Sequence, residues 1–299
     1  MAPPEHRELI HEQVEGLAAD HVVVEPYPRG NAAAIGLAMA VLHAFDPEAV
    51  VAVLPSDHIV ERPDRFRKVI VAATAAAERG HLVTLGIEPK SPDTGFGYIE
   101  AGDPLDLGTA LEVRAVKRFI EKPDRATAEK MIAAGHHYWN AGMFVWRVDT
   151  VLEAYRKHLP KTAKALEDLE RAHGSDRYEA VLTEVWEETD RTTIDYGIAE
   201  KARQVAVVPA DIGWHDVGSW ERLAKIVAGD GSGGVGDQVS IGSRGVYSWA
   251  PGKVVALIGV SDLVVVDTGD ALLIAARDST EEVRAVVEKL RQDGREELL

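Results

Sequence analysis

Short β-branched apolar runs alternate with Ala-rich amphipathic stretches along the first half of the chain. The predicted strands are 21–26, 49–55, 82–87, 113–122 and 142–148, and the predicted helices between them are 32–45 and 64–79. This alternation is typical of βαβ units around a mostly parallel, mixed sheet, so the pattern predicts an α/β fold. Because the runs are apolar almost throughout, we expect helices on both faces of the sheet.

The pattern changes in the second half of the chain. Residues 149–203 are mainly helical in pattern and precede one more apolar run, 205–211. The segment "GDGSGGVGD" (229–237) predicts a flexible link, and we place there the boundary between a domain of residues 1–228 and a small β-rich module of residues 229–299. Short strands fill that module, and a helix capped by Ser279 is expected to close it.

Charge and composition exclude several classes of function. Lys and Arg total 33 against 49 Asp and Glu in 299 residues, and a net charge of −16 opposes binding to nucleic acid or to anionic lipid. No apolar run approaches the roughly 20 residues that cross a bilayer, and the N-terminus lacks the order of a secretory signal, so we expect a cytoplasmic protein. With no cysteine present, a metal site would use oxygen or imidazole ligands.

Two acidic residues lie where the pattern ends a strand or turns the chain. Asp57 follows the predicted strand 49–55 in "VLPSDHIV", and Asp216 lies in "GWHDVGSW", which we interpret as a turn. Ligands of open α/β sheets bind beyond the carboxyl ends of strands, and two carboxylates on separate loops can hold one Mg²⁺. Helix or turn capping is the structural alternative for each acid; together they favour a metal site.

Four further segments offer polar groups to a ligand, and each also has an ordinary structural explanation. These groups are Gly95 in "SPDTGFGYIE", Glu121 and Lys122 in "RFIEKP", Asn140 in "YWNAGMFVW" and Asp195 in "TIDYGIAEK". A β-hairpin would also explain Gly95, and an exposed ion pair at a strand end would explain Glu121 and Lys122. A helix N-cap would explain Asp195. Adjacent residues on a strand point to opposite faces, so Glu121 and Lys122 can serve one ligand only if the strand bends there.

Taken together and in order, these segments resemble the mannose-1-phosphate guanylyltransferases, or GDP-mannose pyrophosphorylases, of the sugar-nucleotidyltransferase superfamily. The matching runs are "EPYPRGNAAAI", "LPSDHIV", "TGFGYIE", "RFIEKP", "WNAGMF", "TIDYGIAEK" and "DVGSW". The tail also resembles the β-rich extension that follows the catalytic domain in this family. The resemblance implies a Rossmann-like nucleotidyltransferase that joins mannose 1-phosphate to GTP and yields GDP-mannose and pyrophosphate.

The resemblance also implies roles for individual residues. Asp57 and Asp216 match the Mg²⁺-binding acids of the family, and Lys122 matches its contact with the sugar phosphate. The implied sugar contacts are Gly95, Glu121 and Asn140. Asp195 falls in a matching motif and is predicted to bind substrate, without a more specific role. Glu25 and Arg29 are predicted to bind the nucleotide. A sugar-phosphate oxygen attacks the α-phosphorus of GTP directly, so catalysis needs positioning and charge neutralisation rather than a protein nucleophile.

The chain departs from the family pattern in two places. The N-terminal glycine-rich loop of the form G-x-G-T-R-x-x-P has no match, so we expect that the sequence starts at an internal methionine and that this chain has poor activity and marginal stability. Gly30 and Asn31 replace the commoner Asn-Thr pair near the nucleobase, which keeps open another NTP or another hexose 1-phosphate. We interpret His58, which follows Asp57, as a supporting residue.

Two expectations concern partners. A catalytically silent regulatory subunit that binds sugar nucleotides is the alternative from a different class of protein. Exposed apolar strands such as "LVVVD" in the C-terminal module are usually covered, which favours a homo-oligomer.

Overall fold

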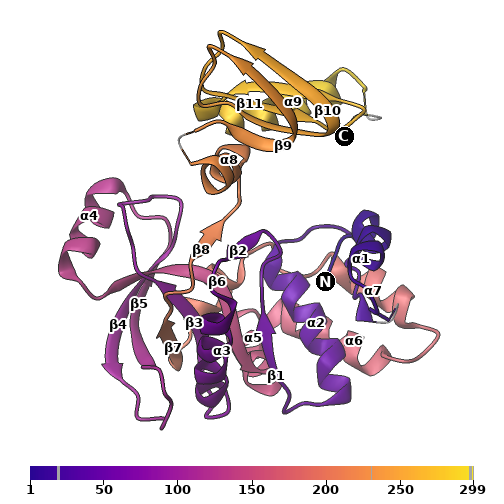
Figure 1. Cartoon of the computed structure of the whole chain (residues 1–299). Coiled ribbons are helices and arrows are strands. Elements are labelled where there is room, and N and C mark those ends of the chain that lie inside the picture. The colour runs from indigo at the N-terminus through magenta and orange to yellow at the C-terminus, as the bar shows by residue number, and fades with distance from the viewer. Residues whose placement is uncertain (19–20, 230, 296–297, 299) are drawn as a thin grey trace. The chain divides into compact units, whose positions relative to one another are not determined.

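The computed structural model describes residues 1–18, 21–229, 231–295 and 298, and these residues form two compact units (Figure 1). The first unit contains Met1–Pro55 and Glu61–Ile212, and the second contains Ser56–Val60 and Gly213–Leu299. The domain boundary at residues 228 and 229 stays a prediction, and residue 230 of the predicted link lies outside the described residues.

A mixed sheet forms the centre of the first unit. Its strands are β1 (Val50–Val53), β3 (Leu82–Ile87), β4 (Tyr98–Pro104), β5 (Arg114–Ile120), β6 (His137–Arg147) and β7 (Val205–Pro209), in the order β1-β6-β3-β7-β5-β4. β3 and β7 pair in parallel, whereas β6 runs antiparallel to β1, β3 and β4. The predicted α/β class with a mixed sheet is therefore confirmed.

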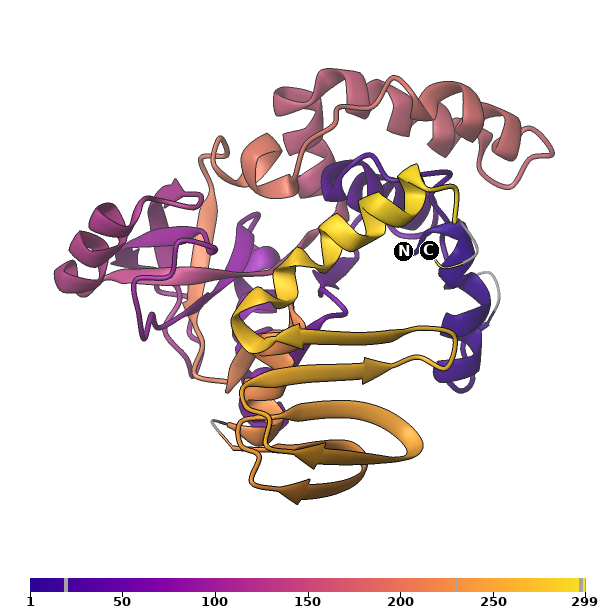
Figure 2. The ribbon, with the colours of Figure 1, turned by 90° about the horizontal axis from the view of Figure 1, so that it is seen from above.

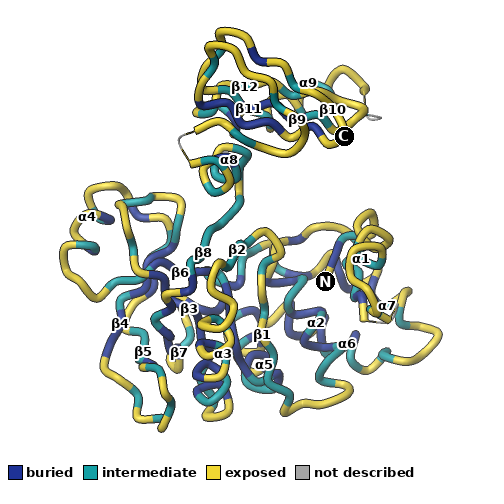
Figure 3. The backbone as a smooth tube through the Cα atoms, viewed as in Figure 1, coloured by how far each residue is buried: buried dark blue, intermediate teal, exposed yellow. Residues whose placement is uncertain are grey.

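Helices lie on both faces of this sheet. The helices of the first unit are α1 (Arg7–Gln13), α2 (Asn31–Phe45), α3 (Pro63–Ala77), α4 (Arg125–Ala134), α5 (Val148–His158), α6 (Pro160–Ala172) and α7 (Tyr178–Trp186). On one face, Phe144 and Trp146 of β6 belong to the same buried core as α2, α5 and α6. α3 packs against β3, β6 and β7, and strand alternation turns Val145 away from that core, which accounts for the continuously apolar strands (Figure 3).

Residues 21–26, predicted as a strand, do not form one. Val24 makes an isolated bridge with Ala2, and the Glu25 N–H donates to the Ala2 carbonyl at 3.1 Å. The apolar run is instead explained by packing, because Val22 is buried without a neighbouring strand. The other predicted strands and helices of this unit are present, with bounds shifted by a few residues.

The second unit is rich in β-structure, as predicted. Its elements are β2 (His58–Val60), β8 (Trp214–Asp216), α8 (Trp220–Ala228), β9 (Gly233–Ile241), β10 (Tyr247–Ile258), β11 (Leu263–Asp267), β12 (Leu272–Ala276) and α9 (Val283–Gln292). β2 pairs with β8, and β9, β10 and β11 follow one another as parallel neighbours (Figure 2).

Two predictions for this unit are wrong. The glycine-rich segment is not a flexible link from Gly233 onward, because those residues form β9; a Cβ at Gly234 would collide with the Ser248 carbonyl of β10, so glycine permits the close pairing. The closing helix begins at Val283 rather than Thr280, because a 3₁₀ turn over Arg277–Glu282 precedes it, and Ser279 therefore does not cap it.

No helix within the described ranges is long and apolar enough to cross a membrane.

Candidate functional site

The chain bends sharply where β5 ends. Such a bend is needed if the adjacent side chains of Glu121 and Lys122 are to face the same ligand. β5 stops at Ile120, and Lys122 has a φ of 46°, in the left-handed region that non-glycine residues rarely adopt. This conformation breaks the strand alternation and leaves the Lys122 Nζ 3.9 Å from the Glu121 carboxylate. The two side chains can therefore serve one ligand, and a residue held in this region is a mark of functional strain.

Glu121 is a buried carboxylate among other acids. Burial, together with the carboxylates of Asp195 and Glu200, raises its pKa to about 7 against the opposing effect of Lys122. Gly97 on the neighbouring segment makes this packing possible, because a Cβ there would collide with the Glu121 Oε2. Gly97 is a site residue that the sequence analysis missed, having chosen Gly95 two residues earlier.

Asn140 and Asp195 are brought together from distant parts of the chain. The Asn140 Nδ2 donates to the Asp195 Oδ1 at 2.8 Å, and burial raises the pKa of Asp195 while this hydrogen bond lowers it. Asp195 is not an N-cap, since it is the first residue of a π-helical turn, Asp195–Ala199, that Ile194 precedes. π-helical turns often occur at functional sites. Three of the predicted substrate-binding residues, Glu121, Asn140 and Asp195, thus form one cluster with Lys122.

Gly95 lies two residues before Gly97, in the loop that precedes β4. It is exposed, and its N–H donates to the Asp93 Oδ1 at 2.8 Å, so that its amide is already bonded in a local turn. The Tyr98 hydroxyl donates to the Asp93 carbonyl at 3.0 Å and holds the same loop. A sugar contact by Gly95 stays a prediction.

A pocket of about 450 Å³ lies beside the cluster in the first unit. Its lining residues are Pro28, Arg29, Gly30, Arg191, Thr192, Thr193 and Tyr196. Burial raises the pKa of Tyr196, and the negative charges of nearby carboxylates, Glu121 first among them, raise it further. This volume is of the size that small-molecule ligands occupy.

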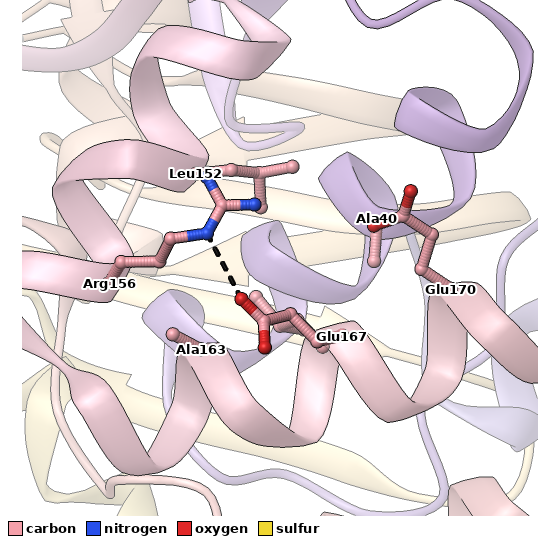
Figure 4. A pocket seen from close by; sticks show the side chains of 7 residues that line it. Ala40, Leu152, Arg156, Ala163, Glu167 and Glu170 are labelled. Atoms are coloured by element: carbon pink, nitrogen blue, oxygen red, sulfur yellow. Dashed lines mark hydrogen bonds and ion pairs between the residues drawn. The ribbon is translucent and has the colours of Figure 1, made fainter.

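A second cavity, between α2, α5 and α6, measures only about 10 Å³ (Figure 4). Arg156 and Glu167 close one side of it with an ion pair of 3.0 Å. Such a space holds at most one water molecule, so we regard it as a packing feature of the helical layer.

Arg29 lines the larger pocket, but its guanidinium is engaged by the protein. It donates to the carbonyls of Glu187 and Thr189 and, at 3.2 Å, to the Thr189 hydroxyl. Glu25 is partly buried, burial raises its pKa, and its Oε2 has no hydrogen-bond partner among the described residues. Nucleotide binding by these two residues stays a prediction. The contacts of Arg29 show that it fixes the backbone at Glu187 and Thr189, directly after α7.

Asp57 and Asp216 lie on the small ladder of the second unit. The Val217 N–H donates to the Asp57 carbonyl at 3.0 Å, and His58 is paired in register with Asp216. Asp216 ends strand β8 rather than lying in a turn, which corrects the interpretation of "GWHDVGSW". The two acids, 159 positions apart in sequence, are thus neighbours across two strands.

His58 supports Asp57 in this ladder. The Trp214 indole N–H donates to the His58 Nδ1 at 3.2 Å, so the neutral ring carries its proton on Nε2, which lies 3.9 Å from the Asp57 Oδ1. Burial lowers the pKa of His58, and the negative charges of Asp57 and Asp216 oppose that effect. The ring is therefore held neutral and directed toward the acid.

The donor set of the ladder fits a hard divalent cation. The Asp57 side chain is 60% exposed and so accessible to a ligand, while Asp216 accepts from the Arg222 guanidinium at 3.1 Å. Magnesium commonly takes one or two protein carboxylates and keeps its remaining positions for water and phosphate. No group of three or more His, Asp or Glu side chains in the described part of the chain is arranged to hold a metal ion.

The fold and these clusters define a class of protein. Residues 2–232 match the nucleotidyl transferase family, and residues 236–290 match the MannoseP isomerase/GMP-like beta-helix domain. The chain therefore belongs to the nucleotidyl transferase family, whose members generally use a divalent metal ion.

Several named proteins are similar to this chain over almost its whole length. The mannose-1-phosphate guanylyltransferase of Escherichia coli (strain K12) is 37% identical over 98% of this chain and 63% of its own length. The xanthan biosynthesis protein XanB of Xanthomonas campestris pv. campestris (strain ATCC 33913) is 37% identical over 99% of this chain and, again, 63% of its own length. The chain thus spans somewhat less than two thirds of these curated relatives.

A solved structure agrees with both units. The crystal structure of a protein from Thermus thermophilus, described as a mannose-1-phosphate geranyltransferase, superposes with a TM-score of 0.83 at 32% identity, covering 97% of this chain and 83% of that one. The α/β nucleotidyltransferase fold with a β-rich C-terminal module is therefore established for this chain.

Proposed function

We propose that the protein is a mannose-1-phosphate guanylyltransferase, which transfers GMP from GTP to mannose 1-phosphate for GDP-mannose biosynthesis. The carrying observation is the cluster at the end of β5, where the Lys122 ammonium lies 3.9 Å from the Glu121 carboxylate and Asn140 is bonded to Asp195 at 2.8 Å. Acids and an amide suit sugar hydroxyls, and an adjacent ammonium suits a phosphate. The names of the relatives support the same substrates.

The reaction follows from the chemistry of the two substrates. An oxygen of the mannose 1-phosphate attacks the α-phosphorus of GTP, a new P–O bond forms, and the bond to the β-phosphate breaks to release pyrophosphate. The net charge of −16 repels a phosphate, and the Lys122 ammonium would offset that repulsion locally and hold the attacking phosphate. Glu121 and Asn140 would orient the sugar.

Asp57 and Asp216 are the residues that would hold Mg²⁺. When bound, the ion would neutralise charge on the triphosphate and on the departing pyrophosphate. The neutral His58 ring lies 3.9 Å from the Asp57 carboxylate, and the ion pair of Asp216 with Arg222 balances that acid in the free protein.

The direct test measures product formation with purified protein and defined substrates. GTP, dTTP and UTP are each supplied with mannose 1-phosphate or glucose 1-phosphate and Mg²⁺, and nucleotide sugars are separated by anion-exchange chromatography. We expect GDP-mannose to form fastest. Preference for another pair would refute the substrates, and binding of mannose 1-phosphate without turnover would support the silent regulatory subunit instead.

We also propose that two copies associate through the second unit. Contrary to expectation, the "LVVVD" run is not exposed, because Val264, Val265 and Val266 of β11 are buried. Other strands of the unit expose large apolar side chains, including Ile241, Val254, Ile258, Leu272 and Ile274. Light scattering after size exclusion should give a dimer, and Ile258→Lys should shift it toward monomer; a monomer at micromolar concentration would refute the interface. Because GTP is an intracellular substrate, we place the reaction in the cytoplasm, which cell fractionation would test.

A further inference from the structure

A single buried threonine in the central sheet controls the direction in which the Asn140 amide faces. Thr84 lies on β3, fully buried between β6 and β7, and its hydroxyl donates to the Asn140 Oδ1 at 2.8 Å. Its neighbours Val83 and Leu85 are fully buried and apolar. A hydroxyl at such a position is costly unless it is hydrogen-bonded, so this one is explained by its partner.

A bulge in β6 presents Asn140 to this hydroxyl. Thr84 pairs with Phe144 and Gly86 pairs with Asn140, so residues 141–143 of β6 lie opposite one residue of β3. Gly142 adopts a φ of 67°, and its N–H donates to the Asn140 Oδ1 at 3.2 Å. Bulges of this kind turn a side chain out of the regular alternation beside functional sites.

These contacts leave one orientation for the amide. A backbone N–H can only donate, so the atom that faces Gly142 and Thr84 must be the carbonyl oxygen. The NH₂ group then faces Asp195, to which one hydrogen is donated. No hydrogen bond from its second hydrogen to another described residue is seen in the structure.

We propose that Thr84 is a positioning residue for sugar recognition: through its hydrogen bond it fixes the Asn140 amide so that the NH₂ group faces Asp195 and a hydroxyl of the bound hexose. This role rests on the proposed function. Thr84 itself is fully buried, and its one hydroxyl hydrogen lies nearer the Asn140 Oδ1, at 2.8 Å, than the Met143 carbonyl, at 3.2 Å, which competes for it.

Two variants separate the hydroxyl from the shape of the side chain. Thr84→Val keeps the branched shape and removes the donor, whereas Thr84→Ser keeps the donor. Thr280→Val, at a buried threonine of the second unit, controls for loss of a buried hydroxyl elsewhere. We expect Thr84→Val to raise the KM for mannose 1-phosphate about tenfold and the KM for GTP less than twofold, with Thr84→Ser within about threefold of the native enzyme.

A spectroscopic readout follows the amide itself, because the sequence contains only two asparagines, Asn31 and Asn140. Selective ¹⁵N-asparagine labelling gives two side-chain amide pairs, and Asn31→Asp identifies which pair belongs to Asn140. In the native protein the two Asn140 protons should differ in shift and exchange slowly. In Thr84→Val both protons should move toward the two separate shifts of a solvent-exposed asparagine side chain and exchange faster, and Thr84→Ser should restore the native signals.

The two readouts also distinguish the inference from the function it rests on. Unchanged Asn140 signals in a folded Thr84→Val would overturn the role of Thr84, and so would an equal loss in Thr84→Ser. Altered signals combined with an unchanged KM for mannose 1-phosphate would overturn its role in recognition. If the native protein binds no mannose 1-phosphate, the proposed function fails, while the signals still decide whether Thr84 positions the amide.

Discussion

Replacing Glu121 by glutamine should stabilise the protein at alkaline pH while weakening its sugar site. Burial and the charges of Asp195 and Glu200 raise the Glu121 pKa from 4.5 to about 7, so the folded state resists ionisation of this group. The stability it contributes is fully present below pH 4.5 and is lost as pH rises through about 7. Glutamine is neutral at every pH and keeps the shape of the protonated acid.

The magnitude follows from the difference between the two pKa values. At about 1.4 kcal/mol for each pKa unit, the gap between 4.5 and about 7 corresponds to about 3 kcal/mol. The pKa of about 7 already includes the effect of Lys122, and screening by solvent of this partly exposed group leaves about 1–2 kcal/mol. For a protein of this size that gain corresponds to about 3–5 °C in Tm.

Thermal unfolding of both proteins between pH 5 and pH 8.5 tests this reasoning. The Tm of Glu121→Gln should exceed that of the native protein at pH 8 and approach it at pH 5. Glu184→Gln, the same chemical change on an exposed position of α7, should change the Tm little at either pH. A gain of equal size at pH 5 and pH 8, or a lower Tm at pH 8, would refute the reasoning.

Four further substitutions test the packing of Glu121, the acids of the ladder and the contacts of Arg29. Gly97→Ala should raise the Kd for mannose 1-phosphate at least about tenfold in calorimetry, because the added Cβ displaces the Glu121 carboxylate; an unchanged Kd would contradict that packing. Asp57→Asn and Asp216→Asn should each lower kcat about 100-fold or more with a Tm within about 2 °C of native, and retained Mg²⁺-dependent turnover would contradict their role. Arg29→Ala should lower the free energy of unfolding in urea by about 2–4 kcal/mol, because buried carbonyls lose a charged donor; weaker GTP binding at unchanged stability would favour the nucleotide contact instead.

The sequence predicted most strands and helices of the first unit because strands such as β3 and β7 are buried and almost entirely apolar, and because several helices begin or end near proline or glycine. β4, which carries acidic residues and follows a loop with two glycines, was not predicted. Residues 21–26 show the limit of predicting strands from apolar runs. A run of valines indicates that the segment is buried, but it does not indicate that another strand lies beside it. In "GDGSGGVGD" the glycines were read as a flexible link, whereas they allow β9 to approach β10. Composition alone does not distinguish these two uses of glycine.

The candidate site shows a similar division. The polar residues of short motifs, such as Glu121, Lys122 and Asn140, were identified because their chemistry is visible in the sequence. Thr84 and Gly97 were missed, since a threonine inside an apolar strand and a second glycine in a loop have no distinctive pattern. Their importance comes from what lies opposite them across β3 and β6 or beside Glu121, and only the folded chain supplies those neighbours.

The most direct test of the central claim is a calorimetric titration of mannose 1-phosphate into the native protein and into Lys122→Met, with mannose as the competing ligand. We expect the native protein to bind the sugar phosphate, mannose to bind much more weakly, and Lys122→Met to lose at least about tenfold in affinity. Equal affinity of the native protein and Lys122→Met for mannose 1-phosphate would contradict the claim that the cluster at the end of β5 recognises a hexose 1-phosphate.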